Sequence, residues 1–294
     1  KFHRKALSVC PNTSDIDDGD LAQSYADVGY IHQLNSEFSE ALDYYEKTHA
    51  IYLHLYGEKH PFTATSFTNI GYIHFRTGDL NKSLVYYEKG LSLRKELFGE
   101  NHLAVAHSVD NIGGYYTRIG EKEKAIDYHL KALKIRLDLL GEKHLDNTLS
   151  YLNVGIALIV NGDKERGIEF LEKAVRLCKE LSEENSLRYA LICSNFGSIH
   201  ANLKNYGEAL DCHKTALRIR IDKLGNHPDT ATAYNHIGVT LTRISEDNKA
   251  IEYFNSALEI DIQILGENHA NTARDYHNIG IANSNLGNFK LSHK

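Results

Sequence analysis

Apolar side chains recur along the chain at the three- and four-residue spacing of amphipathic helices. In residues 123–141, EKAIDYHLKALKIRLDLLG, the apolar positions fall along one helical face, and the closing Gly141 suits the left-handed conformation of a helix end. Residues 60–78, HPFTATSFTNIGYIHFRTG, form a second kind of helical stretch. It carries Pro61 near its start, and proline is favoured in the first helical turn. The two patterns alternate along the chain and predict pairs of helices joined by short turns.

These helix pairs form a repeat. A glycine near the middle of each first helix, called the signature glycine below, recurs at spacings of 42, 42, 42, 42, 41 and 42 residues: Gly29, Gly71, Gly113, Gly155, Gly197, Gly238 and Gly280. The single spacing of 41 arises because residues 224–228, LGNHP, lack one residue found in YGEKHP at 56–61. A unit repeated at near-constant spacing predicts stacked helix pairs that share a continuous core.

Fixed distances from the signature glycine make the unit resemble the tetratricopeptide repeat. A small residue follows twelve positions later, a large side chain four beyond it, and usually a second small residue three further on. The small residues are Ala41, Ser83, Ala125, Gly167, Ala209, Ala250 and Ser292, and the large ones Tyr45, Tyr87, His129, Leu171, His213 and Phe254. The 42-residue period and the LGExHP connector are similar to the kinesin-light-chain subtype. The resemblance implies an all-α fold, a right-handed superhelical solenoid of helix-turn-helix repeats.

The repeat register predicts a single array over residues 1–294. A partial repeat and linker at 1–21 precedes repeats at 22–63, 64–105, 106–147, 148–189, 190–230 and 231–272, and a truncated repeat follows at 273–294. Both ends fall inside a repeat and the chain contains no Met, so we expect a fragment of a longer protein. Ends without a polar capping helix leave self-association open.

Composition narrows the function classes. With 42% hydrophobic and 24% charged residues, only three prolines and no apolar run near the ~18 residues that span a bilayer, we expect a helical protein with no membrane partner. The net charge of −6 argues against nucleic acid as a partner. Four cysteines in no CxxC pair are typical of reduced thiols, which predicts a cytoplasmic protein.

No pattern indicates catalysis, a metal or a cofactor. One histidine recurs in the connector of five repeats, at His60, His102, His144, His227 and His269. A metal site needs ligands that converge on one centre, whereas these residues share one structural phase in separate repeats, so we expect a structural role in the loop. The acidic stretch DIDDGD at 15–20 does not fit a calcium-binding loop. Nucleotide-binding and metalloprotease motifs are absent, and we expect no enzyme activity.

In the tetratricopeptide fold the first helices line a concave groove. By this resemblance, the groove positions lie six, three and two before the signature glycine, and one, four and five after it. The position two before is asparagine in five of seven repeats: Asn69, Asn111, Asn153, Asn195 and Asn278. A carboxamide both donates and accepts, so such a row could hold the backbone of an extended peptide. Alternatively, each asparagine bonds to the neighbouring repeat and serves packing.

Further groove positions suggest what a peptide would carry. Repeat four is apolar at five of these positions, Leu149, Leu152, Ile156, Ile159 and Val160, while Tyr30 and Tyr72 add aromatic groups. The patch in repeat four is either an apolar ligand anchor or a surface for packing or self-association. The cations Arg76, Arg118 and Arg243 favour a ligand with acidic residues.

The expected function is therefore a non-catalytic scaffold or adaptor that binds an extended peptide segment of a partner protein. A second hypothesis is a sensor or oligomerisation module of a larger signalling protein, with the groove occupied by its own chain. A third is a structural spacer that binds no peptide.

Overall fold

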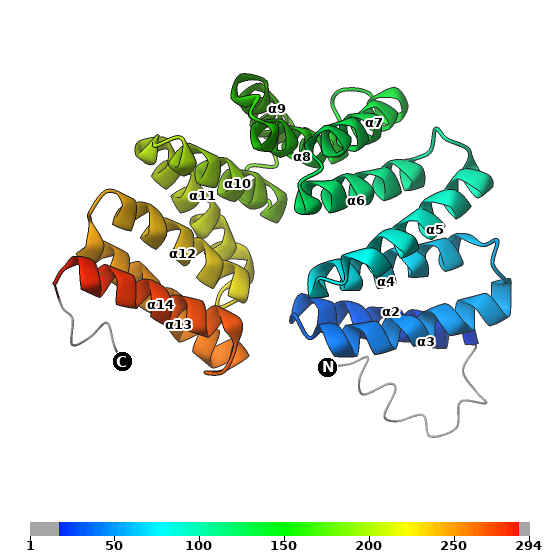
Figure 1. The fold of residues 1–294 in the computed structure, drawn as a ribbon, viewed down its shortest axis with the longest axis horizontal. Helices are drawn as coiled ribbons and strands as arrows, with labels where there is room; N and C mark the ends of the chain where they lie inside the picture. Colours follow the sequence, from blue (N-terminus) through cyan, green and yellow to red (C-terminus); the bar gives the residue numbers. More distant parts are fainter. Residues whose placement is uncertain (1–17, 288–294) are drawn as a thin grey trace. The chain divides into compact units, whose positions relative to one another are not determined.

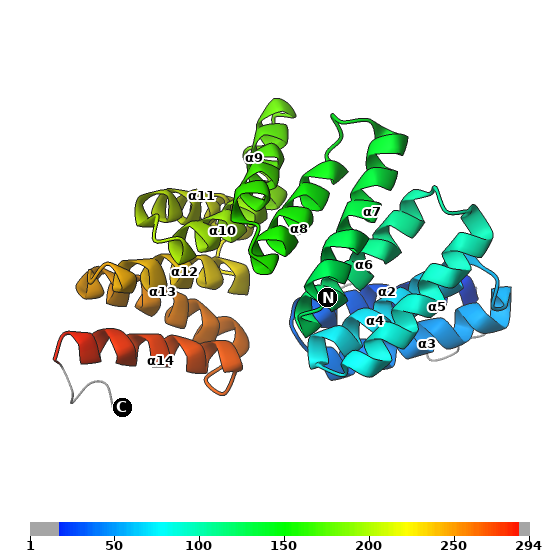
Figure 2. The ribbon, with the colours of Figure 1, turned by 45° about the horizontal axis from the view of Figure 1, so that its top comes forward.

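The computed structural model describes residues 18–287, and every regular element in that range is an α-helix (Figure 1). The predicted all-α fold class is confirmed. Within residues 18–161, and again within residues 187–285, every helix packs against the next one in the sequence, as Figures 1 and 2 allow the reader to follow. Because each helix pair buries its apolar face against the following pair, the core runs along the stack.

The described part of the chain divides into two compact units, with the boundary between Glu169 and Phe170. The first unit contains α2 (Asp18–Leu34), α3 (Phe38–Tyr56), α4 (Pro61–Thr77), α5 (Leu80–Phe98), α6 (Leu103–Ile119), α7 (Lys122–Leu140) and α8 (Asp146–Asn161). The boundary falls inside α9 (Lys164–Glu180). The second unit continues with α10 (Leu187–Asn202), α11 (Tyr206–Leu224), α12 (Pro228–Arg243), α13 (Asp247–Leu265) and α14 (Ala270–Asn285). Whether the repeats form one array stays a prediction.

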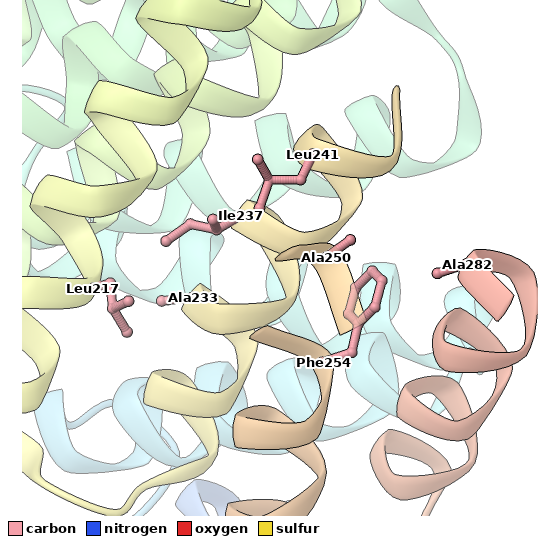
Figure 3. Close-up of a cluster of buried hydrophobic side chains, with 7 residues drawn as sticks. All are labelled: Leu217, Ala233, Ile237, Leu241, Ala250, Phe254 and Ala282. Carbon is pink, nitrogen blue, oxygen red and sulfur yellow. The ribbon is translucent and has the colours of Figure 1, made fainter. Parts of the chain in front are cut away.

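The signature glycines bring the two helices of a repeat together. A Cβ atom on Gly71 would lie 2.8 Å from the Tyr87 ring, and one on Gly238 would lie 2.5 Å from the Phe254 ring. In these two repeats, and likewise at Gly29, Gly113 and Gly197, the large side chain sixteen positions later occupies the space that the glycine leaves empty. Figure 3 shows the result in the second unit, where the buried side chains of Leu217, Ala233, Ile237, Leu241, Ala250, Phe254 and Ala282 form one cluster.

The turn between the two helices of a repeat has one backbone requirement. The residue seven positions after the signature glycine is left-handed in every repeat: it is glycine in four of them, and Ser36, Lys204 or Ser245 elsewhere, with φ of 61°, 66° and 62°. Left-handed backbone disfavours side chains with a Cβ. The stack thus imposes the turn even where the sequence carries no glycine.

The connector histidines have the structural role that their spacing predicted. Nδ1 of His102 accepts a hydrogen bond from the backbone N–H of Ala104 at 3.1 Å, in the first turn of α6. His60, His144, His227 and His269 accept from the N–H two residues ahead in the same way, at 3.1–3.3 Å. These side chains satisfy an N–H that the helix itself leaves unpaired.

Candidate groove

A cavity of about 460 Å³ opens in the first unit between α2, α3, α4 and α6. Ten of its eleven lining residues lie at the groove positions of repeats one to three: Gln23, Ala26, Asp27, Tyr30, Gln33, Thr68, Asn69, Tyr72, His107 and Asn111. The eleventh, Tyr45, comes from a second helix. The cavity thus lies at positions that the repeat register assigns to the groove, and the side chains there leave it open.

Two of the predicted asparagines face this cavity. Asn69 on α4 and Asn111 on α6 both line it, and neither side chain has a hydrogen-bond partner among the residues that the structure describes. A partly exposed carboxamide without a partner offers its N–H groups and its oxygen to an arriving ligand. These two asparagines are the strongest peptide-binding candidates of the predicted row.

The other three asparagines already donate hydrogen bonds within the protein. Nδ2 of Asn153 donates to the Asp110 carboxylate at 3.2 Å, and Nδ2 of Asn278 donates to the Asn235 side chain at 2.9 Å. Nδ2 of Asn195 donates to the Leu191 carbonyl of its own helix at 2.9 Å. For these positions the contacts match the packing alternative, and a role in peptide binding stays a prediction.

Aromatic groups form the apolar part of the cavity. The Tyr30 side chain is 52% exposed, and Tyr72 lies beside it in the lining. Nη1 of Arg76 donates to the Tyr72 hydroxyl at 2.7 Å, while its guanidinium stacks over the Phe38 ring at 4.8 Å. This arrangement holds a tyrosine ring open to solvent with a cation next to it.

The other two predicted cations are also held by neighbouring repeats. The Arg118 guanidinium lies 4.9 Å from the centroid of the Phe75 ring, and Nη1 of Arg243 donates to the Asn202 side chain at 3.0 Å in the second unit. Neither guanidinium has a carboxylate partner within the described residues. Their charges remain available to an acidic ligand, although neither side chain lines the cavity.

The apolar patch of repeat four is only partly accessible. Leu152 is 3% exposed, and the same position is buried as Thr68, Ser194 and Asn235 in other repeats. Ile159 packs at the place where a Cβ on Gly167 would lie 2.4 Å from its Cγ1. Leu149 and Ile156 are half-buried, whereas Val160 is 44% exposed. The contacts of Leu152 and Ile159 match the packing alternative, and a role of these two side chains in peptide binding stays a prediction.

One groove position, Asp110, is part of a buried network of charged side chains. Asp110 Oδ1 accepts from Nδ1 of His129 at 2.6 Å, and Oδ2 accepts from Nη1 of Arg136 at 3.1 Å. Burial alone would raise the pKa of Asp110, but the hydrogen bond from His129, the charges of His129 and Arg136 and the bond from Asn153 outweigh it, so the pKa is lowered. This carboxylate therefore joins α6 to α7 and α8.

Sequence reasoning passed over one recurrent position. Twenty-three residues after the signature glycine, buried arginine occurs three times, at Arg94, Arg136 and Arg220. Their regular spacing was visible in the sequence, but the resemblance assigns this helix to the core and gives no reason to look there for charge. The buried acid Asp261 holds the same position in the following repeat.

Residues 18–287 contain neither of two other kinds of site. No group of three or more His, Cys, Asp or Glu side chains there could hold a metal ion. Within the same range no helix combines the length and apolar character needed to cross a bilayer.

Comparison with solved structures shows the fold. The structures that match include BtubC (BKLC) from P. vanneervenii, with TM-score 0.59, 18% identity, and coverage of 80% of this chain and 92% of that one. A Rap protein complexed with Competence and Sporulation Factor matches with TM-score 0.67 and 13% identity, covering 97% and 80%. A signal transduction ATPase (STAND) protein with a tetratricopeptide repeat sensor from Pyrococcus horikoshii matches with TM-score 0.61 and 15% identity, covering 99% and 42%.

Sequence comparison settles the family. No curated protein matches the chain. The family described as Tetratricopeptide repeat matches residues 20–96, 62–138, 145–221, 190–263 and 229–294. These overlapping matches cover nearly all of the seven repeats read from the glycine spacing, and they confirm the resemblance on which the groove positions rest. The chain belongs to the tetratricopeptide repeat family.

Proposed function

We propose that the chain is a non-catalytic protein-interaction scaffold whose first unit binds an extended peptide segment of a partner protein. Tetratricopeptide repeats are typical of such scaffolds. The observation that carries the proposal is the cavity whose lining includes two carboxamides, Asn69 and Asn111, that have no hydrogen-bond partner among residues 18–287. An extended backbone presents N–H and C=O groups that a carboxamide can pair with regardless of the peptide's side chains.

The cavity's other side chains favour a particular kind of segment. Tyr30 and Tyr72 offer ring faces for an apolar anchor, and rigid aromatic groups contribute much of the affinity at interfaces. Arg76 and Arg118, on the exposed ends of α4 and α6, favour acidic residues that flank the anchor. A peptide with one apolar side chain and nearby carboxylates matches both features.

Asn153, Asn195, Asn278 and Arg243 remain secondary candidates, together with Leu149 and Ile156. In this proposal they act only where a longer partner reaches beyond the cavity, and the asparagines would have to exchange their present hydrogen bonds for those of the ligand. Because that exchange offsets much of the gain, we expect each to contribute less than Asn69 or Asn111.

An array of immobilised octapeptides of varied sequence tests the function. The wild-type chain is expected to bind a subset of peptides, and the double variant Asn69→Ala/Asn111→Ala is expected to lose about tenfold or more in affinity for them, as for two lost hydrogen bonds. Asn101→Ala, an exposed asparagine in the loop before α6, is the matched control and should bind like wild type. Equal affinity of the double variant for every peptide would place the binding surface elsewhere.

A sensor module of a larger signalling protein is the second candidate. It is suggested by the similarity in fold to the STAND protein with its tetratricopeptide repeat sensor. In that role the groove would hold a segment of the same polypeptide. The array then gives weak binding throughout, and peptides taken from the protein's own flanking sequence bind best.

A further inference from the structure

Arg94 on α5 is a buried cation whose partners are all neutral. Its side chain is 6% exposed. Nη1 donates to the Ser108 hydroxyl at 2.6 Å and to the Ala104 carbonyl at 3.4 Å, and Nη2 donates to the Thr65 hydroxyl at 3.3 Å. Among the residues that the structure describes, no carboxylate contacts it. Burial lowers the pKa of this guanidinium, which shows how little the surroundings do to stabilise its charge.

The next repeat shows what completes this arrangement. Arg136 holds the same register position as Arg94, and its Nη1 donates to the Ser150 hydroxyl at 2.5 Å as Arg94 does to Ser108. In addition, Nη1 of Arg136 donates to the Asp110 carboxylate at 3.1 Å. That aspartate lies three positions before its signature glycine, where repeat two carries Thr68. Repeat two therefore has the arginine, and the following repeat supplies the hydroxyl, but the acid is missing.

The place left without an acid adjoins the candidate groove. Thr68 lines the cavity, next in sequence to Asn69. His107 lines it from α6, and burial together with the charges of Arg94 and Arg136 lowers the pKa of its imidazole. The ring is thus neutral at physiological pH and can donate an N–H to an anion. The single carboxyl group in the lining, Asp27, belongs to α2 of repeat one and accepts from Gln23 at 2.9 Å.

We propose that the groove contains a carboxylate subsite in repeat two. There a carboxylate of the bound peptide enters between Thr68 and His107, which line the cavity, and reaches the buried Arg94 guanidinium, which is not itself part of the lining. It then takes the part that Asp110 takes toward Arg136. The proposal rests on the proposed function and adds the chemical class that the site selects. Charge-assisted hydrogen bonds to a buried guanidinium are stronger than those to the exposed Arg76, because solvent screens the charge of Arg76.

The decisive variant is Thr68→Asp, which supplies the acid from within the chain. Thr68 lies opposite Gly90, because a Cβ on Gly90 would lie 3.0 Å from the Thr68 Oγ1, and the missing Cβ leaves space for the new carboxylate. Thr68→Asn is the matched control, with the same shape and no charge. Pairing with Arg94 is expected to raise the urea midpoint of Thr68→Asp above that of Thr68→Asn, which shows that the variant folds and that the acid has reached the guanidinium.

The binding probe is a set of labelled octapeptides taken from the array, each prepared with Glu or Gln at every position and with a C-terminal acid or amide. In fluorescence polarisation, wild type and Thr68→Asn should bind the carboxylate member of one matched pair about tenfold or more tightly. For Thr68→Asp the same pair should differ less than about twofold. A Glu/Gln preference identifies an acidic side chain as the ligand group, and an acid/amide preference identifies the peptide's C-terminus.

The outcomes separate the subsite from the groove. Peptides that bind through Asn69 and Asn111 but show no carboxylate preference would overturn the subsite and leave the proposed function standing. A preference that persists in Thr68→Asp and disappears in Arg76→Gln would overturn it too, since the carboxylate then binds the exposed cation. If no peptide binds the wild-type chain, both proposals fail.

Discussion

Gly113 and Gly114 are consecutive residues of α6, yet a methyl group added to each meets opposite surroundings. At Gly113 the new Cβ would lie 2.8 Å from Cε1 and Nδ1 of His129, whereas at Gly114 it would meet nothing within 4 Å. The imidazole cannot withdraw easily, because His129 is 4% exposed and its Nδ1 is bonded to Asp110 at 2.6 Å.

These contacts determine how much each alanine variant should change the free energy of unfolding. Overpacking costs about 1–3 kcal/mol, and loosening a hydrogen bond to a charged group costs about 1.5–3 kcal/mol. Replacing glycine by alanine inside a helix returns about 1 kcal/mol. We therefore expect Gly113→Ala to lower the free energy of unfolding by about 2–4 kcal/mol, and Gly114→Ala to raise it by about 0.5–1 kcal/mol.

Urea unfolding followed by helical circular dichroism measures both variants against wild type. A solenoid can unfold in parts, so the first transition is the one to compare. Near-equal stability of the two alanine variants would refute the reasoning, because it would mean that His129 moves aside at little cost and that the signature glycine does not fix the distance between α6 and α7.

Three further predictions concern other parts of the repeat. His102→Ala should lower the free energy of unfolding by about 1 kcal/mol because the Ala104 N–H loses its acceptor. His102→Asn can still cap the helix and should lose less. Equal losses of stability in urea unfolding would contradict the capping role. Asp261 is buried beside Asp275, and burial, with the charge of Asp275, raises its pKa to about 7 from 3.8. Wild-type stability should therefore fall as pH rises from 4 toward 7, by at most about 4 kcal/mol, and Asp261→Asn should remove that fall in thermal melts taken across the range. Leu152→Asp should destabilise the protein by several kcal/mol because it buries a charge. Val160→Asp should stay within about 0.5 kcal/mol of the wild-type stability. Equal stability of the two variants would show that Leu152 is accessible to solvent.

The architecture could be predicted because it depends on short-range rules that each repeat states again. A glycine that must approach a ring, a large side chain sixteen residues later and a helix-capping histidine recur with one period, so a misreading in one repeat is corrected by the others. Even the turn that lacks glycine at Lys204 follows the register. The groove positions could be assigned for the same reason, and ten of them, all in repeats one to three, line the cavity.

The state of each groove side chain could not be predicted, because it depends on which residue the neighbouring repeat supplies. Asn111 and Asn153 hold the same register position, but Asn153 donates to Asp110 of the preceding repeat while Asn111 has no described partner. The residue that corresponds to Asp110 one repeat earlier is the neutral Thr68. Groove positions counted within a single repeat treat the two asparagines alike. Their different hydrogen bonding can be predicted only when the residues of two neighbouring repeats are considered together.

The position twenty-three residues after the signature glycine extends this argument to charge. Arg136 is paired with Asp110. Burial lowers the pKa of Arg220, and the Asp229 charge counteracts part of that effect. Asp261, of opposite sign, lies 3.5 Å from the Arg274 guanidinium. Along the described second helices, each charge at this position thus has an opposite charge nearby, except Arg94.

A buried ion without a counterion is costly, and a folded chain can keep one where a ligand supplies the missing charge. The exception falls in repeat two, where the neighbouring groove positions, Thr68 and Asn69, line the cavity and Asn69 has no hydrogen-bond partner among the described residues. The Asn69 carboxamide lines this hollow, and the charge of the buried Arg94 acts on His107, which lines it too. A peptide that brings a carboxylate and a backbone to this place satisfies both groups at once.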